Sequence, residues 1–321
     1  MESNLNQTRH FSEAVVLEKP NELGLKTLQI EEVKSDEILV DIQYSGISTG
    51  TERLLYEGRM PDFPGMGYPL VPGYESIGTV EKSGSQSDFL PGEKVFVPGA
   101  KCFGDLKSLF GGTASKLVVS SKRVCKVPKE TGEEGSLLAL AATANHVFSV
   151  NGDCKPNIIV GHGALGRLIA KIAVLKGLNP IVIEANKERR KGNFEYEVIG
   201  PLESKKLTGD CVVDASGDSS QLNDLIKFLK PQGEIVLAGF YDKPLSFDFA
   251  PAFLREAKIR VSAQWTPRDL KEVSALFTTK KINFEDLISH RVSVNSISQA
   301  YETAFNDSSC LKMIINWKGL S

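Results

Sequence analysis

The chain has 321 residues, of which 41% are hydrophobic and 24% are charged, and its formal net charge at pH 7 is -2. This balance is typical of a globular protein, and the length predicts about two domains. A charge so close to zero excludes the strongly basic surface that nucleic acid or an anionic membrane attracts.

We find no targeting or membrane-spanning pattern in the sequence. Residues 1–10 are polar and lack the apolar core of a signal peptide, and the most apolar stretch, residues 137–144, is too short to cross a bilayer. The five cysteines are dispersed without a CxxC pair, which is typical of reduced thiols. We therefore expect a cytoplasmic protein.

Residues 13 to about 128 have the pattern of a β domain. Short runs of β-branched and aliphatic residues, separated by Gly, Pro and Asn, predict strands at 14–17, 37–42, 94–97, 117–119 and 123–127. Many short strands of this kind indicate a twisted, barrel-like β domain. Residues 46–73 are rich in Gly, Pro and aromatic residues, and we expect loops and one short helix there.

From Glu133 strands alternate with helices, which predicts a doubly wound α/β domain of the Rossmann type. The expected helices are 133–150, 164–176 and 221–229, and the expected strands are 157–160, 180–183, 211–215, 234–238 and 259–262. The tail from about residue 266 has no core of its own, so we expect it to complete the β domain. The predicted domains are thus 133–265 for the dinucleotide and 1–132 with 266–321 for the β domain.

A glycine-rich turn follows the first strand of the second domain and opens a helix, as GxGxxG: Gly161-His162-Gly163-Ala164-Leu165-Gly166. In this setting the glycines permit a tight turn, close approach of a pyrophosphate and helix–sheet packing, and the helix N-terminus attracts phosphates. We expect the His162 side chain to point outward. Glu184 ends the next strand, where a carboxylate accepts hydrogen bonds from ribose hydroxyls and repels a 2′-phosphate. This predicts NAD, while Arg189 and Arg190 keep NADP as an alternative.

Further cofactor contacts are expected where later strands end. Ser216 follows one strand, and Gly239 and Phe240 follow another; ligands of open α/β sheets bind at the carboxyl ends of strands. Ordinary strand-to-loop turns would give the same pattern, so both interpretations stay open.

A β domain, a Rossmann domain and a returning tail resemble the medium-chain dehydrogenase/reductase superfamily over nearly the whole chain, which implies a GroES-like β domain. At the positions where zinc-dependent members carry ligands, this chain has Ser48, Tyr74 and, near Thr143, Ala139; only Glu75 matches. The resemblance therefore implies a site without zinc, because a tetrahedral site needs Cys, His or carboxylate donors at three positions. It also implies that Thr143 lies by the cofactor.

Three longer segments are similar to one zinc-free family, the hydroxyethyl bacteriochlorophyllide a dehydrogenases: GISTGTERLLYEGRMPDFPGMGYPLVPGYESIGTV, VFVPGAKCFGDLKSLFGG and LLALAATANHV. This resemblance implies that a tetrapyrrole is the substrate, that its hydroxyethyl group is oxidised to acetyl with NAD, and that the reaction belongs to bacteriochlorophyll biosynthesis. The superfamily further implies a homodimer. One departure is a shortened crossover between Glu184 and the strand at Cys211.

Without a metal, a side chain must accept the proton of the alcohol. Tyr74 is the first candidate, because the family frame places it facing the nicotinamide, and His146 is the second, because imidazole titrates near neutral pH. Glu75 could orient a neighbour or serve as a structural carboxylate. Ser48 and Thr51 could bind the substrate oxygen or cap a helix. An apolar loop could hold the flat pigment or simply pack against the domain, and it contains Tyr56, Met60, Phe63, Met66 and Tyr68.

Two other functions fit the same residues. A zinc-free quinone or enoyl reductase using NADPH would share the fold, although Glu184 argues against it. A non-catalytic NAD-binding sensor would keep the dinucleotide site and turn nothing over.

Overall fold

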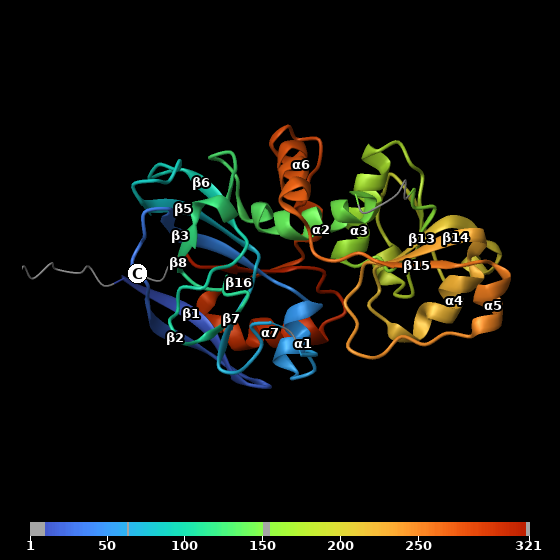
Figure 1. Cartoon of the computed structure of the whole chain (residues 1–321), viewed down its shortest axis with the longest axis horizontal. Coiled ribbons are helices and arrows are strands. Elements are labelled where there is room, and N and C mark those ends of the chain that lie inside the picture. The colour runs from blue at the N-terminus through green and yellow to red at the C-terminus, as the bar shows by residue number, and fades with distance from the viewer. Residues whose placement is uncertain (1–9, 63, 150–154, 319–321) are drawn as a thin grey trace, which may run out of the picture. The chain divides into compact units, whose positions relative to one another are not determined.

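The computed structural model describes residues 10–62, 64–149 and 155–318 (Figure 1). The described chain forms two compact units: the β unit comprises the residues up to Leu137 and those from Phe284 onward, and the dinucleotide unit is Leu138–Asn283. The expected boundaries were 133 and 266. The second unit extends further because α6 (Pro267–Thr278) packs against α2 (Leu138–Ser149).

Two open sheets build the β unit. The smaller sheet has the order β2-β1-β4-β7, with strands β1 (His10–Lys19), β2 (Glu22–Ile30), β4 (Leu70–Pro72) and β7 (Lys107–Leu109). The larger has the order β16-β17-β3-β5-β6-β9, and its strands from the first half of the chain are β3 (Glu37–Ile47), β5 (Ser76–Ser83), β6 (Lys94–Val97) and β9 (Cys125–Lys126). Strand β8 (Lys116–Ser120) also pairs with β3. Within the described residues the sheets do not close into a barrel.

The C-terminal segment completes the larger sheet. Strand β17 (Met313–Asn316) pairs antiparallel with β3, with Met313 opposite Ile47, and β16 (His290–Ser293) lies beyond it. Helix α7 (Ile297–Asn306) buries Tyr301 and Phe305 in the core of the same unit. The tail therefore brings Lys312 and Tyr301 next to residues that lie more than two hundred positions earlier in the chain.

The dinucleotide unit has a parallel sheet of the order β12-β11-β10-β13-β14-β15. Its strands are β10 (Ile158–Val160), β11 (Ile181–Ile183), β12 (Glu197–Ile199), β13 (Gly209–Asp214), β14 (Leu229–Leu237) and β15 (Lys258–Val261). The direction of strand progression reverses between β10 and β13, and this switch point is where open α/β sheets bind ligands. The predicted Rossmann architecture is thus confirmed. Its helices include α3 (Ala164–Leu175), α4 (Leu222–Lys227) and α5 (Phe249–Leu254).

The sequence predicted one shortened crossover between Glu184 and Cys211, but this segment also contains strand β12, which was not predicted, and the crossover from β11 to β12 is short. It contains one short 3-10 helix, Glu188–Arg190, where a longer crossover would carry an α-helix. No helix in the described ranges is long and apolar enough to cross a membrane.

Candidate active site

The glycine turn of the dinucleotide unit has the close contacts that its glycines predict. Gly161 has φ 96°, and a Cβ there would lie 2.9 Å from the backbone nitrogen of Ser216. A Cβ on Gly166 would lie 1.9 Å from the carbonyl oxygen of Gly161. Gly163 is the N-cap of α3, and a Cβ on it would have Nη1 of Arg189 as its nearest neighbouring atom, at 3.9 Å. The first turn of α3, with Ala164 and Leu165 only partly buried, therefore leaves room for a pyrophosphate against the backbone.

Glu184 lies directly beside this turn. Its Oε2 accepts a hydrogen bond from the backbone N–H of His162 at 2.7 Å, and its Oε1 accepts one from the N–H of Asn186 at 2.7 Å. Two backbone donors hold the carboxylate at the carboxyl end of β11. Each oxygen retains acceptor capacity, so the group could still bind ribose hydroxyls.

The expectation that the His162 side chain points outward is wrong. The residue is fully buried; its Nδ1–H donates to the carbonyl of Arg189 at 2.7 Å, and its Nε2 accepts from the hydroxyl of Tyr196 at 2.9 Å. Phe194 packs edge-on against the ring. Burial lowers the pKa of His162 to about 4. The aromatic residues of the short crossover pack against the glycine turn. The His162 imidazole therefore binds the crossover and does not face solvent.

The carboxyl ends of β13 and β14 lie next to one another. A Cβ on Gly239 would lie 2.8 Å from the backbone nitrogen of Gly217. Asp214 was not predicted: its Oδ1 accepts from the N–H of Ser216 at 2.9 Å and its Oδ2 from the hydroxyl of Tyr241 at 2.5 Å. Burial raises the pKa of Asp214. Phe240 is 42% exposed, so at this edge of the sheet an aromatic side chain remains available to a ligand.

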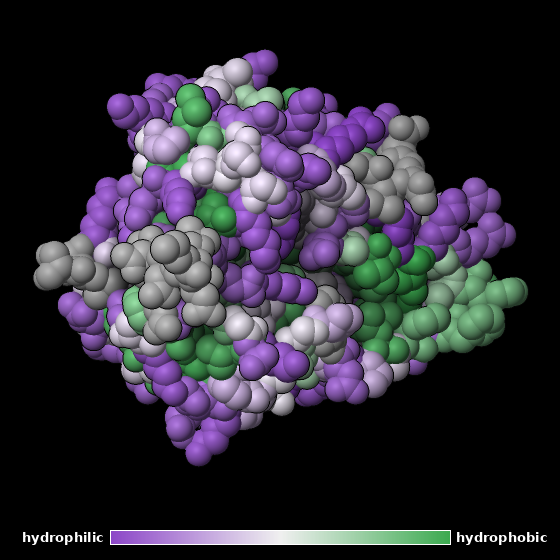
Figure 2. Space-filling view, turned by 60° about the vertical axis from the view of Figure 1, so that its left-hand side comes forward, coloured by the Kyte–Doolittle hydropathy of each residue, from purple (hydrophilic) through white to green (hydrophobic). Residues whose placement is uncertain are grey.

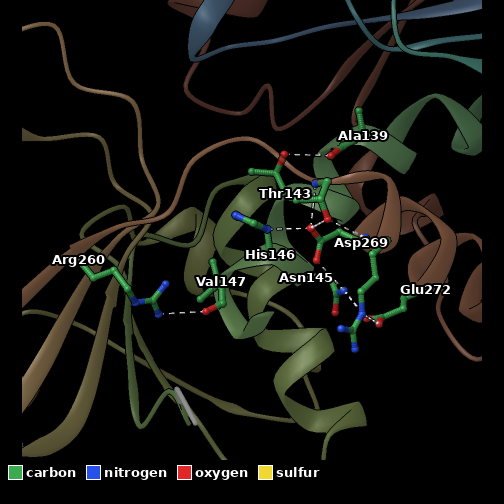
Figure 3. Close-up of polar contacts among 10 residues, drawn as sticks. Ala139, Thr143, Asn145, His146, Val147, Arg260, Asp269 and Glu272 are labelled. Atoms are coloured by element: carbon green, nitrogen blue, oxygen red, sulfur yellow. Dashed lines mark hydrogen bonds and ion pairs between the residues drawn. The ribbon is translucent and has the colours of Figure 1, made fainter. Parts of the chain in front are cut away.

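Helix α2 carries a second polar cluster (Figure 3). Nδ1 of His146 lies 2.7 Å from Oδ2 of Asp269, a fully buried residue at the start of α6. The hydroxyl of Thr143 donates to the carbonyl of Ala139 within the same helix, at 3.0 Å. Sequence reasoning missed Asp269, although the pattern Thr-x-x-Asp before an apolar run is the signal of a capping box.

In the β unit, Tyr74 and Ser48 lie together. The hydroxyl of Tyr74 donates to Oγ of Ser48 at 2.9 Å. Burial, and then the nearby carboxyl of Glu75, raise the pKa of Tyr74. The phenol therefore stays protonated and can donate a hydrogen bond, but it is a poor resting base.

Glu75 is a buried carboxylate paired with Lys312. The ammonium lies 2.9 and 2.8 Å from the two carboxylate oxygens, and it also donates to the carbonyl of Ile47 at 3.3 Å. Both residues are at most 2% exposed. This geometry fits the interpretation of Glu75 as a structural carboxylate. The sequence contains no pattern that predicts Lys312, 237 positions later, as its partner.

Glu52 is a second buried carboxyl group, which sequence reasoning also missed. It accepts from the hydroxyl of Tyr301 at 2.7 Å and from the N–H of Ser48 at 3.2 Å, and burial raises its pKa to about 7. Glu52 is the second residue of helix α1 (Thr51–Tyr56), whose N-cap is Gly50 and which has no side-chain cap. Neither Ser48 nor Thr51 therefore serves as the helix cap.

The expected substrate loop packs largely on its own unit. Four of its residues contact an apolar cluster formed by Leu17, Leu55, Leu70 and Leu109, and these four are Tyr56, Met60, Met66 and Tyr68. The Tyr68 hydroxyl donates to the carbonyl of Leu55. These contacts favour the interpretation that the loop packs against its own domain over the interpretation that it binds the pigment. Phe63 lies outside the described residues.

The residues at the zinc-ligand positions do not fit a metal. Ser48 and Tyr74 bond to one another, and Glu75 is neutralised by Lys312. Across residues 10–62, 64–149 and 155–318, no three His, Cys, Asp or Glu side chains come together as a metal site.

Comparisons with known proteins cover both units. The alcohol dehydrogenase GroES-like domain family matches residues 34–129, and the zinc-binding dehydrogenase family matches residues 164–279. The 2-desacetyl-2-hydroxyethyl bacteriochlorophyllide A dehydrogenase of Cereibacter sphaeroides is 44% identical over 95% of this chain and 98% of its own. The enzyme of that name from Rhodobacter capsulatus is 44% identical over 96% of this chain and 98% of its own.

Solved structures share the fold at low identity. L-idonate 5-dehydrogenase from Escherichia coli superposes with a TM-score of 0.84 at 18% identity, covering 97% of this chain and 99% of that one. The alcohol dehydrogenase rspB from E. coli, solved with NADH, has a TM-score of 0.80 at 20% identity, covering 96% and 99%.

Proposed function

Because the chain belongs to the 2-desacetyl-2-hydroxyethyl bacteriochlorophyllide A dehydrogenase family of the medium-chain dehydrogenase/reductase superfamily, we propose that it oxidises the hydroxyethyl side chain of a bacteriochlorophyllide precursor to acetyl, with NAD and without zinc. The observation that carries this proposal is the 44% identity over nearly the full length of both chains. Oxidoreductases of one fold differ widely in substrate, so this full-length identity supports the substrate more directly than the fold does.

NAD is favoured over NADP by the two charged residues at the glycine turn. The carboxylate of Glu184, held by two backbone donors, would repel a 2′-phosphate on the adenosine ribose. Nη1 of Arg189 lies near the Cβ position of Gly163, over the part of the turn that takes the pyrophosphate. We therefore propose that Arg189 binds the pyrophosphate and that Glu184 binds the adenosine ribose.

The proton of the alcohol needs an acceptor that is neutral at physiological pH. We propose His146, because its Nδ1 is already bound to Asp269 and its Nε2 can take the proton. NAD, when bound, supplies the hydride acceptor. The carbinol carbon loses a hydride, Nε2 of His146 takes the hydroxyl proton, and the C–O bond becomes C=O. The phenol of Tyr74 stays protonated, so it is less suited than His146 to accept the proton.

The product identifies the reaction. The purified chain, incubated with hydroxyethyl bacteriochlorophyllide a and NAD, is expected to yield a pigment that has lost two hydrogen atoms, with one NADH formed for each. Mass spectrometry of the pigment measures this directly. Pigment reduction at the expense of NADPH would support the reductase alternative, and NADH binding with unchanged pigment would support the sensor.

We also propose that the protein is a cytoplasmic homodimer. The five cysteines are dispersed along the chain without a CxxC pair, which suits a reducing compartment. Strand β15 is the edge of its sheet, with Val261 68% exposed, and Phe249 and Phe253 of α5 are 71% and 64% exposed. Figure 2 shows a broad apolar area at its right-hand side. An open edge with apolar neighbours favours pairing with a second copy, which sedimentation velocity would measure.

A further inference from the structure

The cluster on α2 contains a histidine whose ring is held by a buried carboxylate (Figure 3). Oδ2 of Asp269 is 2.7 Å from Nδ1 of His146, and the same carboxylate accepts from the backbone N–H of Thr266 at 2.8 Å and from its hydroxyl at 2.6 Å. Asp269 is fully buried and His146 is 9% exposed. Neither the sequence motifs nor the family frame singled out Asp269.

We propose that Asp269 is the positioning residue of the reaction: it fixes the ring of His146 and holds it in the tautomer that leaves Nε2 free to accept the substrate proton. This inference rests on the role proposed above for His146. It adds the group, Asp269, that sets the orientation and tautomer of this base.

The donor and acceptor properties of the pair determine the tautomer. An ionised carboxylate only accepts hydrogen bonds, so the neutral imidazole must place its proton on Nδ1 to bond with Asp269. The lone pair then resides on Nε2. Figure 3 shows the ring turning one nitrogen to Asp269 and the other to the opposite side.

The surroundings keep the carboxylate in place. Thr266 supplies two donors, and the side-chain amide of Asn145 lies 3.4 Å from Oδ1. The same amide donates to Oε2 of Glu272 at 3.0 Å, one turn further along α6. A buried carboxylate fixed in this way also stabilises the imidazolium that forms when Nε2 takes the proton, since opposite charges attract strongly away from water.

Asp269 also caps helix α6, and the test must separate this structural role from the positioning of His146. Asp269 is the N3 residue of a capping box with Thr266, so its removal weakens the start of α6 whatever it does for His146. Thr266→Ala breaks the same capping box and removes the hydroxyl donor to Oδ2, while the backbone N–H of residue 266 and the amide of Asn145 still hold the carboxylate beside Nδ1. It is therefore the matched control for Asp269→Asn, which keeps the side-chain shape but can donate to Nδ1 and so permits the wrong tautomer.

The experiment compares the wild type, Asp269→Asn and Thr266→Ala in the full chain labelled with nitrogen-15 histidine. The proposal expects the His146 signals of the wild type and of Thr266→Ala to show a proton on Nδ1, and those of Asp269→Asn to shift toward a proton on Nε2. It expects kcat to fall about a hundredfold or more in Asp269→Asn, the range that a general base supplies, with the KM for NAD nearly unchanged. Thr266→Ala should lower the thermal midpoint while keeping kcat within about threefold of wild type.

Two results would overturn the proposal: a wild-type His146 with its proton on Nε2, or an Asp269→Asn variant that keeps both the tautomer and kcat of the wild type. His146→Gln tests the underlying function separately. If that variant turned over pigment at the wild-type rate while the wild-type spectrum showed the Nδ1 proton, the base assigned to the reaction would be wrong, and Asp269 would set the tautomer of His146 without a role in the reaction.

Discussion

Two buried carboxyl groups in the β unit, Glu75 and Glu52, differ in how their charge is compensated. Glu75 has the ammonium of Lys312 against both oxygens, whereas Glu52 is bound by a hydroxyl and a backbone N–H. The difference determines how each group responds to mutation and to pH.

Lys312→Met is expected to be strongly destabilising, because it leaves the Glu75 carboxylate buried without its cation. The free energy of unfolding should fall by about 3–5 kcal/mol, as measured by urea denaturation. The double variant Lys312→Met/Glu75→Gln should recover most of this loss, since no unpaired charge remains. A single variant as stable as the wild type would show that the pair is not buried in solution.

Glu52 should make the protein less stable as the solution becomes more basic. Its folded pKa is raised from 4.5 to about 7, so its contribution to stability is fully present below pH 4.5 and is lost as the pH rises through 7. A shift of this size corresponds to about 3 kcal/mol. Glu52→Gln should therefore gain stability relative to wild type at pH 8 and show little gain at pH 5, as measured by thermal unfolding. The exposed Glu130→Gln is the control, and an equal response of the two variants would contradict the account.

At the scale of elements, the short crossover between β11 and β12 is held by one imidazole in place of a helix. His162 joins the glycine turn to Arg189 and Tyr196, and burial lowers its pKa from 6.5 to about 4. The neutral ring is therefore part of the folded crossover, because protonation would bury a charge and reverse the hydrogen bond with Tyr196.

The stability that depends on His162 should be complete above pH 6.5 and be lost as the pH falls toward 4, because the unfolded chain binds the proton more readily. The loss is about 3 kcal/mol. His162→Gln keeps a donor and an acceptor and does not titrate, so its thermal midpoint should fall less than that of the wild type between pH 6.5 and 4.5. Glu52 acts in the opposite sense over part of this range, and for that reason each variant is compared with the wild type. If His10→Gln flattened the profile as much as His162→Gln does, the crossover account would fail.

Elements and local motifs could be predicted from the sequence, and contacts between distant segments could not. The apolar runs, the glycine turn and Glu184 follow local rules of period and turn chemistry, and the structure has them adjacent to one another. The pairs Lys312–Glu75 and Asp269–His146 form only when the fold brings remote segments together. His162 was misplaced for the same reason, because its surroundings come from a crossover more than twenty residues later.

At the scale of the whole molecule, the identity to the bacteriochlorophyllide dehydrogenases extends over both units, while two of the three zinc-ligand positions carry hydroxyl side chains. Loss of these ligands is compatible with a dehydrogenase only if side chains take over the handling of the proton. His146 with Asp269 offers such a group.

The most direct test is the rate of NADH formation from hydroxyethyl bacteriochlorophyllide a by protein dialysed against a strong chelator, with NAD or NADP as the acceptor. The account predicts that turnover survives chelation unchanged and that NADP is about tenfold or more poorer, because Glu184 repels the additional phosphate. Activity that is lost on chelation and restored by zinc would contradict the metal-free chemistry, and NADH binding without any turnover would contradict the substrate.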